Sequence, residues 1–276
     1  MRLGYIDYLN CYPFYYNMFE IEPLDGIEVV PGYPSQLNSM MLEGRLDMSP
    51  VSAAAYADIH DDTVLLPDFC LSSVGYVRSV ILISKIPIEG LHNKRVGLSN
   101  ASKTSVVLLR ILMQRYYGID PVYIETGPQP CLEASGCDAA LIIGNEAMHP
   151  IKEPYVYDLG DLWLRKTGHP VVFAVFAVRR QYIAEESAMI ESVIDSYHDS
   201  LIGLDRDRDR LIQKASSKYP AIDYDIDAYY RLLEYRFTPL LRDALEFYLG
   251  LAGDMGLVNR IPKVNYLQHP DDSATN

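Results

Sequence analysis

The chain has 276 residues, of which 49% are hydrophobic and 22% are charged, and its formal net charge is -13. This length can form one large domain or two lobes with separate cores. The acidic balance argues against nucleic acid as a partner, because binding to phosphates requires a basic face. It also provides no long-range attraction for an anion, so an anionic ligand must be held by local hydrogen-bond donors.

The sequence carries no sign of a membrane partner or a metal site. No apolar run approaches the roughly 18 residues of a membrane-spanning helix. The opening MRLGYIDYL predicts a strand rather than a signal peptide, and we expect a cytoplasmic protein. Neither CxxC nor HExxH spacing occurs, so we expect no zinc site and no cofactor. The four cysteines are Cys11, Cys70, Cys131 and Cys137.

Strand and helix signals alternate along the first third of the chain. Residues 4–9 predict a strand that Asn10 and Pro13 bring to an end, and residues 27–34 hold a second strand and its stop. A helix then precedes the short strand LDMSP, and VSAAAYADI opens the next helix. Repetition of this kind predicts a parallel sheet with helices on both faces.

Two long apolar segments, 75–85 and 169–180, predict strands that bracket a smaller α/β segment. From Glu185 onward, apolar spacings of three and four predict helices to the end. The simplest architecture is an α/β protein of two lobes joined by two crossing strands, with a central cleft that can close over a small ligand. The expected lobes are residues 1–84 plus 175–276, and residues 85–174.

Polar residues gather where the predicted strands end. In open parallel sheets, ligands bind beyond the carboxyl ends of the strands, where helix N-termini offer free N–H groups that favour a carboxylate. Residues 99–105 (SNASKTS) lack the glycines of a P-loop, which favours a carboxylate over a nucleotide. Taken singly, each hydroxyl is more readily explained as a helix cap. The candidates are Ser49, Ser52, Asn100, Ser102, Thr104, Ser105, Gly144 and Asn145, with Asn10 after the first strand and Ser79 in the first crossing strand.

Several blocks of the sequence resemble, in chain order, those of the chorismate dehydratases of the futalosine pathway of menaquinone biosynthesis. They include GYIDYLNCYP, EGRLDMSPVSAAAYA, KRVGLSNASKTSVVLLRILM, DAALIIGNEAM and DLGDLWLRKTGHPVVFAV. The resemblance is close over residues 1–185 and looser over the helical remainder. It implies a type II periplasmic-binding-protein-like fold, which agrees with the two-lobed architecture.

The resemblance implies a lyase that removes water from chorismate to give 3-(1-carboxyvinyloxy)benzoate. It places Asn10 at the reacting centre and Ser79 beside it as a partner from the crossing strand. Neither side chain is a strong base. We therefore hypothesise that the enolpyruvyl carboxylate of the substrate takes the C3 proton, while Asn10 orients the C4 hydroxyl or that carboxylate.

The chain departs from the pattern of this family at two positions. Ala53 stands where relatives usually have a second serine, and Asn145 stands where they usually have aspartate. Both departures leave the carboxylate contacts open.

Three alternatives share the same fold. A 1,4-dihydroxy-6-naphthoate synthase would use a larger substrate and a histidine at its site, and no histidine occurs in SNASKTS or IIGNEA. A small-carboxylate binding protein would need the same cleft without catalysis. The effector domain of a transcription regulator would be preceded by a DNA-binding module. The sequence leaves the oligomeric state open, and a homodimer is one option.

Overall fold

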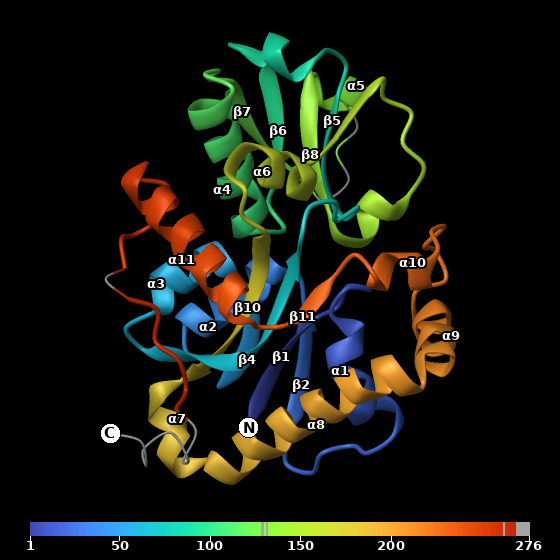
Figure 1. Ribbon diagram of the computed structural model, residues 1–276, viewed down its shortest axis with the longest axis vertical. Coiled ribbons are helices and arrows are strands. Elements are labelled where there is room, and N and C mark those ends of the chain that lie inside the picture. The colour runs from blue at the N-terminus through green and yellow to red at the C-terminus, as the bar shows by residue number, and fades with distance from the viewer. Residues whose placement is uncertain (128–129, 131, 262, 269–276) are drawn as a thin grey trace.

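The computed structural model describes residues 1–127, 130, 132–261 and 263–268. Two β-sheets with surrounding helices form two lobes, which Figure 1 shows one above the other. The α/β class is thus confirmed.

The sheet of the lower lobe has six strands. Their order is β11 (Glu234–Arg236), β4 (Thr63–Ser73), β10 (Val171–Arg179), β3 (Met48–Ser52), β1 (Arg2–Ile6) and β2 (Glu28–Gly32). The strand β1 pairs in parallel with both β2 and β3, as the strand–helix alternation predicted. However, β10 runs antiparallel to β3 and β4, so the sheet is mixed rather than parallel.

The sheet of the upper lobe has five strands. Their order is β7 (Val122–Thr126), β6 (Arg95–Ser99), β8 (Ala139–Ile143), β5 (Val80–Ser84) and β9 (Tyr155–Asp158). The strand β6 is parallel to β7 and β8, whereas β5 is antiparallel to β8 and β9. The division into lobes by residue number stays a proposal. Pairing nevertheless places β5 with the upper lobe and all of β10 with the lower one.

The α-helices cover both sheets. They are α1 (Tyr12–Glu20), α2 (Pro34–Leu42), α3 (Tyr56–Ile59), α4 (Lys103–Ile111), α5 (Leu132–Ser135), α6 (Leu159–Thr167), α7 (Arg180–Glu185), α8 (Ser187–Arg206), α9 (Arg208–Lys218), α10 (Ile226–Tyr230) and α11 (Pro239–Asp254). Short turns of other helix types are η1 (Ala53–Ala55), η2 (Ile88–Leu91), η3 (Leu112–Tyr116) and η4 (Gly144–Met148). In Figure 1, α4 and α6 lie with the upper sheet, and α8 crosses beneath the lower one.

The first crossing segment is not the continuous strand predicted at 75–85. Gly75 and Arg78 have φ angles of 89° and 67°, which an extended strand cannot accommodate, and strand pairing begins only at Val80. The Asp158 side chain accepts hydrogen bonds from the N–H groups of Val77 (3.1 Å) and Arg78 (2.6 Å). These two N–H groups of the irregular backbone therefore have hydrogen-bond partners. The second predicted crossing strand, 169–180, is confirmed as β10.

Sequence patterning missed β4 and also missed a short strand within the helical region. The strand β4 is buried on both faces, so it lacks the alternation that identifies a half-exposed strand. The continuous helical pattern predicted from Glu185 contains the short strand β11. Pro239 begins α11 at its first turn, and it cannot continue a preceding helix because it lacks an N–H group.

The end of β1 passes directly into α1. Residues 7–11 form a tight turn in which the Cys11 N–H donates to the Tyr8 carbonyl at 3.1 Å. Pro13, at the start of α1, is compatible with the first helical turn. Phe14 of α1 then packs on Phe176 of β10, with ring centroids 4.5 Å apart. Because both β1 and α1 are buried, the turn between them, which carries Asn10, is anchored at both ends.

Cys11, Cys70 and Cys137 are buried free thiols, and Cys131 lies outside the described residues. Within the described ranges, no helix combines the length and apolar character needed to cross a bilayer. Those same ranges contain no group of His, Cys, Asp and Glu side chains suited to a metal ion.

The Arg2–Asp47 pair fixes the start of β1 and gives a pH-dependent contribution to stability. Asp47 is 6% exposed and accepts from the Arg2 backbone N–H at 2.7 Å and from its guanidinium at 2.9 Å. Burial alone would raise the pKa of Asp47, but the hydrogen bonds and charge of Arg2 outweigh it and hold that pKa below the usual value. This contribution is therefore present at neutral pH and is lost as the pH falls through the lowered pKa.

We expect Asp47→Asn to lower the free energy of unfolding by about 1 to 2 kcal/mol at neutral pH, because one charged hydrogen-bond acceptor is lost. The difference from wild type should shrink on acidification, as followed by urea denaturation at several pH values. The control is Glu43→Gln, since Glu43 and its partner Arg45 are both more than half exposed. An equal loss in the two variants, or a difference that does not change with pH, would contradict the assignment.

Candidate functional site

A cavity lies at the junction of the lobes, with about 490 Å³ of empty space, part of which is open to solvent. Its wall comes from the turn after β1, the end of β3, the first crossing segment, the start of α4 and the end of β8. Six predicted site residues line it: Asn10, Ser52, Ser79, Ser102, Ser105 and Gly144. The structure thus brings together residues that are far apart in the chain.

The other four predicted residues do not line this cavity. The Ser49 hydroxyl donates to the Pro50 carbonyl, and Asn100 is exposed on the surface. The Thr104 hydroxyl donates to the Phe173 carbonyl at 2.9 Å and is fully buried. Asn145 Oδ1 accepts from the Leu9 N–H at 2.9 Å, which joins the upper lobe to the lower one.

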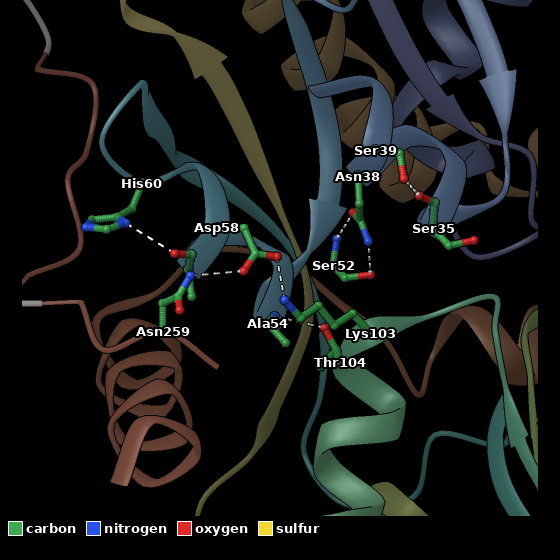
Figure 2. Close-up of polar contacts among 11 residues, drawn as sticks. Ser35, Asn38, Ser39, Ser52, Ala54, Asp58, His60, Lys103, Thr104 and Asn259 are labelled. Carbon is green, nitrogen blue, oxygen red and sulfur yellow. Dashed lines mark hydrogen bonds and ion pairs between the residues drawn. The ribbon is translucent and has the colours of Figure 1, made fainter. Parts of the chain in front are cut away.

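Asn38 of α2 orients Ser52 (Figure 2). Its Nδ2 donates to Ser52 Oγ at 3.1 Å, and its Oδ1 accepts from the Ser52 N–H at 2.9 Å. Because the Ser52 oxygen already accepts a hydrogen bond from Asn38, its own O–H remains available to donate into the cavity. The pair therefore supplies a donor suited to an anionic ligand.

The N-terminus of α4 supplies a second group of donors. Ser102 caps this nine-residue helix and accepts hydrogen bonds from the Ser105 N–H (3.4 Å) and the Ser105 hydroxyl (3.3 Å). The Ser102 hydroxyl proton is thereby left for a ligand. The positive end of the helix dipole adds to the attraction for a carboxylate.

The junction beside these donors is tied by direct contacts between lobes. Thr104 Oγ1 accepts from the Ala54 N–H at 3.2 Å, and Lys103 forms an ion pair with Asp58 (Figure 2). The Ser35 N–H donates to the Ala101 carbonyl at 3.0 Å. The start of α4 is therefore held against η1 and α2 of the lower lobe.

Asn10 has an unsatisfied acceptor at the cavity wall. Its Oδ1 atom is buried and has no hydrogen-bond partner. Leaving such a group unpaired costs about 1 to 3 kcal/mol, so the arrangement favours a ligand that donates a hydrogen bond there. Around it, no Lys, Arg or His side chain from the described part of the chain lines the cavity. Hydroxyl, amide and backbone groups provide its polar contacts.

Tyr8 separates this cavity from a second, more open pocket of about 590 Å³ and lines both. Its hydroxyl and Glu146 Oε2 are buried without hydrogen-bond partners. Burial raises the pKa of Glu146, and burial together with the Glu146 charge raises the pKa of Tyr8. Tyr8 therefore remains a neutral phenol at neutral pH.

The chain is similar to known proteins of one family. A model of the menaquinone biosynthesis family matches residues 1–254. The chain belongs to this family. It is 34% identical over 197 residues to a chorismate dehydratase of Thermus thermophilus, covering 65% of this chain and 70% of that protein. A 1,4-dihydroxy-6-naphthoate synthase of the same organism is 28% identical over 151 residues, or 52% of each chain.

Several solved structures share the fold of this chain. A protein from Archaeoglobus fulgidus has a TM-score of 0.76 at 20% identity, over 93% of this chain and 98% of that one. An alkanesulfonate-binding protein from Xanthomonas axonopodis pv. citri has a TM-score of 0.67 at 15% identity, over 94% of both chains. A Candida albicans protein with the generic periplasmic-binding-protein fold has a TM-score of 0.61 at 13% identity, over 99% of both chains. The predicted periplasmic-binding-protein-like fold is thus confirmed.

Three residues near the cavity were absent from the candidates that the sequence suggested: Tyr8, Asn38 and Asp158. Asp158 has a sequence signal, since an aspartate before an apolar helical pattern is a typical N-cap, and it caps α6. The other two carry no local signal. Their contacts depend on how distant segments fold together.

Gly144 permits the close approach of the lobes. Its φ angle is 68°, and a Cβ atom there would lie 2.5 Å from the Tyr8 ring. Only glycine combines this backbone conformation with contact against the ring face. Gly168 has a φ of 76° but open space around it, so only the backbone conformation requires glycine there.

We expect Gly168→Ala to cost about 1 kcal/mol of folding free energy, from the positive φ alone. Gly144→Ala should cost about 1 to 3 kcal/mol more, because the methyl group displaces Tyr8 and separates the lobes. Equilibrium urea denaturation measures the folding free energy lost in each variant. An increased radius of gyration in small-angle X-ray scattering would show the separation of the lobes in Gly144→Ala. Equal costs in the two variants would show that the Tyr8 contact does not constrain closure.

Proposed function

We propose that this protein is a chorismate dehydratase, a hydro-lyase that converts chorismate to 3-(1-carboxyvinyloxy)benzoate and water. The proposal rests above all on the buried, unpartnered Oδ1 of Asn10 in a cavity lined by hydroxyl donors. The similarity to a chorismate dehydratase supports the choice of substrate.

The two carboxylates of chorismate match the two groups of donors. The Ser52 hydroxyl, held by Asn38, would bind one carboxylate, and the Ser102 hydroxyl at the start of α4, which accepts from Ser105, would bind the other. Fixed donors in a site that excludes water stabilise charge strongly because they need little reorganisation. This explains how a protein of net charge -13 can bind a dianion with local groups.

The reaction begins with loss of the C3 proton, which is acidified by conjugation with the ring carboxylate. The enolpyruvyl carboxylate of the substrate takes this proton, and the electron pair delocalises towards the ring carboxylate. The C4–O bond then breaks, the proton and the hydroxide leave together as water, and the ring becomes aromatic. Asn10 Oδ1 accepts from the C4 hydroxyl and orients it, and Ser79 lines the same cavity.

Incubation of the protein with chorismate tests the proposal directly. Mass spectrometry should show loss of one water, and proton NMR should show a meta-substituted aromatic ring. Unchanged chorismate that raises the thermal unfolding temperature would instead indicate a binding protein. If chorismate is not converted and does not stabilise the protein, chorismate is refuted as the ligand.

We expect Asn10→Ala to lower kcat by about 100- to 1,000-fold, as for other oriented polar groups at a reacting centre. Asn10→Asp should be at least as impaired, because it places a negative charge beside the leaving hydroxyl and two carboxylates. The control is Asn259→Ala, since Asn259 is exposed. Near-normal turnover in folded Asn10 variants would refute this role of Asn10.

Two substitutions of Asn38 test how Ser52 is oriented. Asn38→Asp keeps an acceptor for the Ser52 N–H but draws the Ser52 hydroxyl towards its carboxylate, so this donor is lost to the substrate. We expect KM for chorismate to rise about tenfold in both Asn38→Asp and Asn38→Ala, with a smaller change in kcat. Ser39→Ala, on the exposed side of the same helix, should leave KM unchanged. An unchanged KM in Asn38→Asp would contradict the proposed donor.

A further inference from the structure

Two consecutive residues of η4, Gly144 and Asn145, contact both segments that carry the proposed reacting centre. The Gly144 N–H donates to the Ser79 carbonyl at 2.8 Å. Asn145 Oδ1 accepts from the N–H of Leu9, the residue before Asn10, at 2.9 Å. Asn10 and Ser79 lie in segments that are far apart along the chain. One turn of the upper lobe therefore connects the backbones that carry both side chains.

The Asn145 side chain holds backbone rather than lining the reaction cavity. The sequence made it a candidate for binding substrate, but it is absent from the wall of that cavity and lines the second pocket beyond Tyr8. Its oxygen already has the Leu9 N–H as a donor. Leu9 is fully buried, so this N–H needs a partner from the protein. The contact thus places Asn145 behind the site rather than in it.

The hydrogen bond of Asn145 restrains the chain immediately before Asn10. It fixes the peptide unit that contains the Leu9 N–H, and the Tyr230 hydroxyl fixes the next unit by donating to the Leu9 carbonyl at 3.1 Å. That second unit ends at the nitrogen of Asn10, so its rotation would turn the Asn10 side chain away from the cavity. The Asn145 contact crosses between the lobes, since η4 follows β8 of the upper sheet. Separation of the lobes would remove it.

We propose that Asn145 is a positioning residue, whose side-chain oxygen holds the Leu9 N–H so that Asn10 faces the substrate only when the lobes are docked. Because the Gly144 N–H holds the Ser79 carbonyl, the same turn also sets the spacing of the two residues at the reacting centre. The inference rests on the proposed dehydration for its kinetic consequence and on these hydrogen bonds for its geometry. An amide oxygen suits the role because it accepts a hydrogen bond without adding charge near a dianion.

Hydrogen exchange of the Leu9 amide, followed by NMR without substrate, tests the contact itself. Asn145→Leu keeps a similar size but removes the acceptor, so we expect the Leu9 amide to exchange at least about tenfold faster. Asn145→Asp retains an acceptor oxygen and should keep this exchange within about threefold of wild type. The amides of β10, in the interior of the lower sheet, should be unaffected in both variants. Unchanged exchange at Leu9 in Asn145→Leu, or equal acceleration in β10, would overturn the proposal.

Turnover of chorismate tests the consequence for Asn10. We expect kcat to fall about tenfold in Asn145→Leu with KM within about threefold of wild type, because the serine donors are unchanged. Asn145→Asp should recover kcat to within about threefold, and any effect of its charge on the dianion should appear in KM. The matched control is Gln36→Leu, which should leave kcat unchanged. Gln36 also lines the second pocket, and its Oε1 accepts from a backbone N–H at 2.9 Å, but that N–H belongs to Tyr33 at the start of α2.

A double-mutant cycle shows whether Asn145 acts through Asn10. In the Asn10→Ala background, Asn145→Leu should change kcat by less than about twofold, since the side chain to be placed is absent. Additive losses, or an unchanged kcat in Asn145→Leu alone, would overturn the proposal. If the wild-type protein leaves chorismate unchanged, the proposed function fails, whereas faster exchange at Leu9 in Asn145→Leu still supports the positioning contact.

Discussion

Both backbone hydrogen-bonding groups of Leu9 are held by side chains from distant parts of the chain, and the site depends on this arrangement. Its N–H donates to Asn145 of the upper lobe, and its carbonyl accepts from Tyr230 of α10. The neighbouring Asn10 is thereby fixed by the lower lobe, the upper lobe and the C-terminal helices at once. The same turn places Tyr8 against Gly144, so the turn that carries Asn10 also contacts the upper lobe directly.

The first crossing segment is held by an equally specific contact. Asp158 caps α6 and also accepts from the N–H groups of Val77 and Arg78, which precede Ser79. Burial raises the pKa of this carboxyl, while the backbone hydrogen bonds oppose the shift. A hinge with irregular backbone would ordinarily be loose, but here its N–H groups are satisfied from within the upper lobe. Ser79 is therefore presented to the cavity from a defined backbone.

The cavity suits the proposed chemistry through the arrangement of ordinary groups. Serine hydroxyls acquire a direction because Asn38 and Ser105 occupy their acceptor sites. Asn10 offers an acceptor because its buried carbonyl oxygen is left without a partner. For an elimination whose base is a substrate carboxylate, the protein has to position and stabilise rather than to supply a strong base. A periplasmic-binding-protein-like fold, in which two lobes can close over a small ligand, is well adapted to this task.

The sequence by itself determined the α/β class, the family and much of the cavity wall. Asn10, Ser52, Ser102, Ser105 and Gly144 could be predicted because they follow strands or begin helices, and these strand ends of both sheets meet at the junction of the lobes. The sequence did not determine the partners of these residues, nor the course of β4 and the first crossing segment. Asn38 acts through its contacts with Ser52 of another element, and β4 is buried on both faces, so neither leaves a local pattern. Only the tertiary structure decided which hydrogen-bonding group of each polar side chain stays free, because that depends on which partners the fold brings within reach.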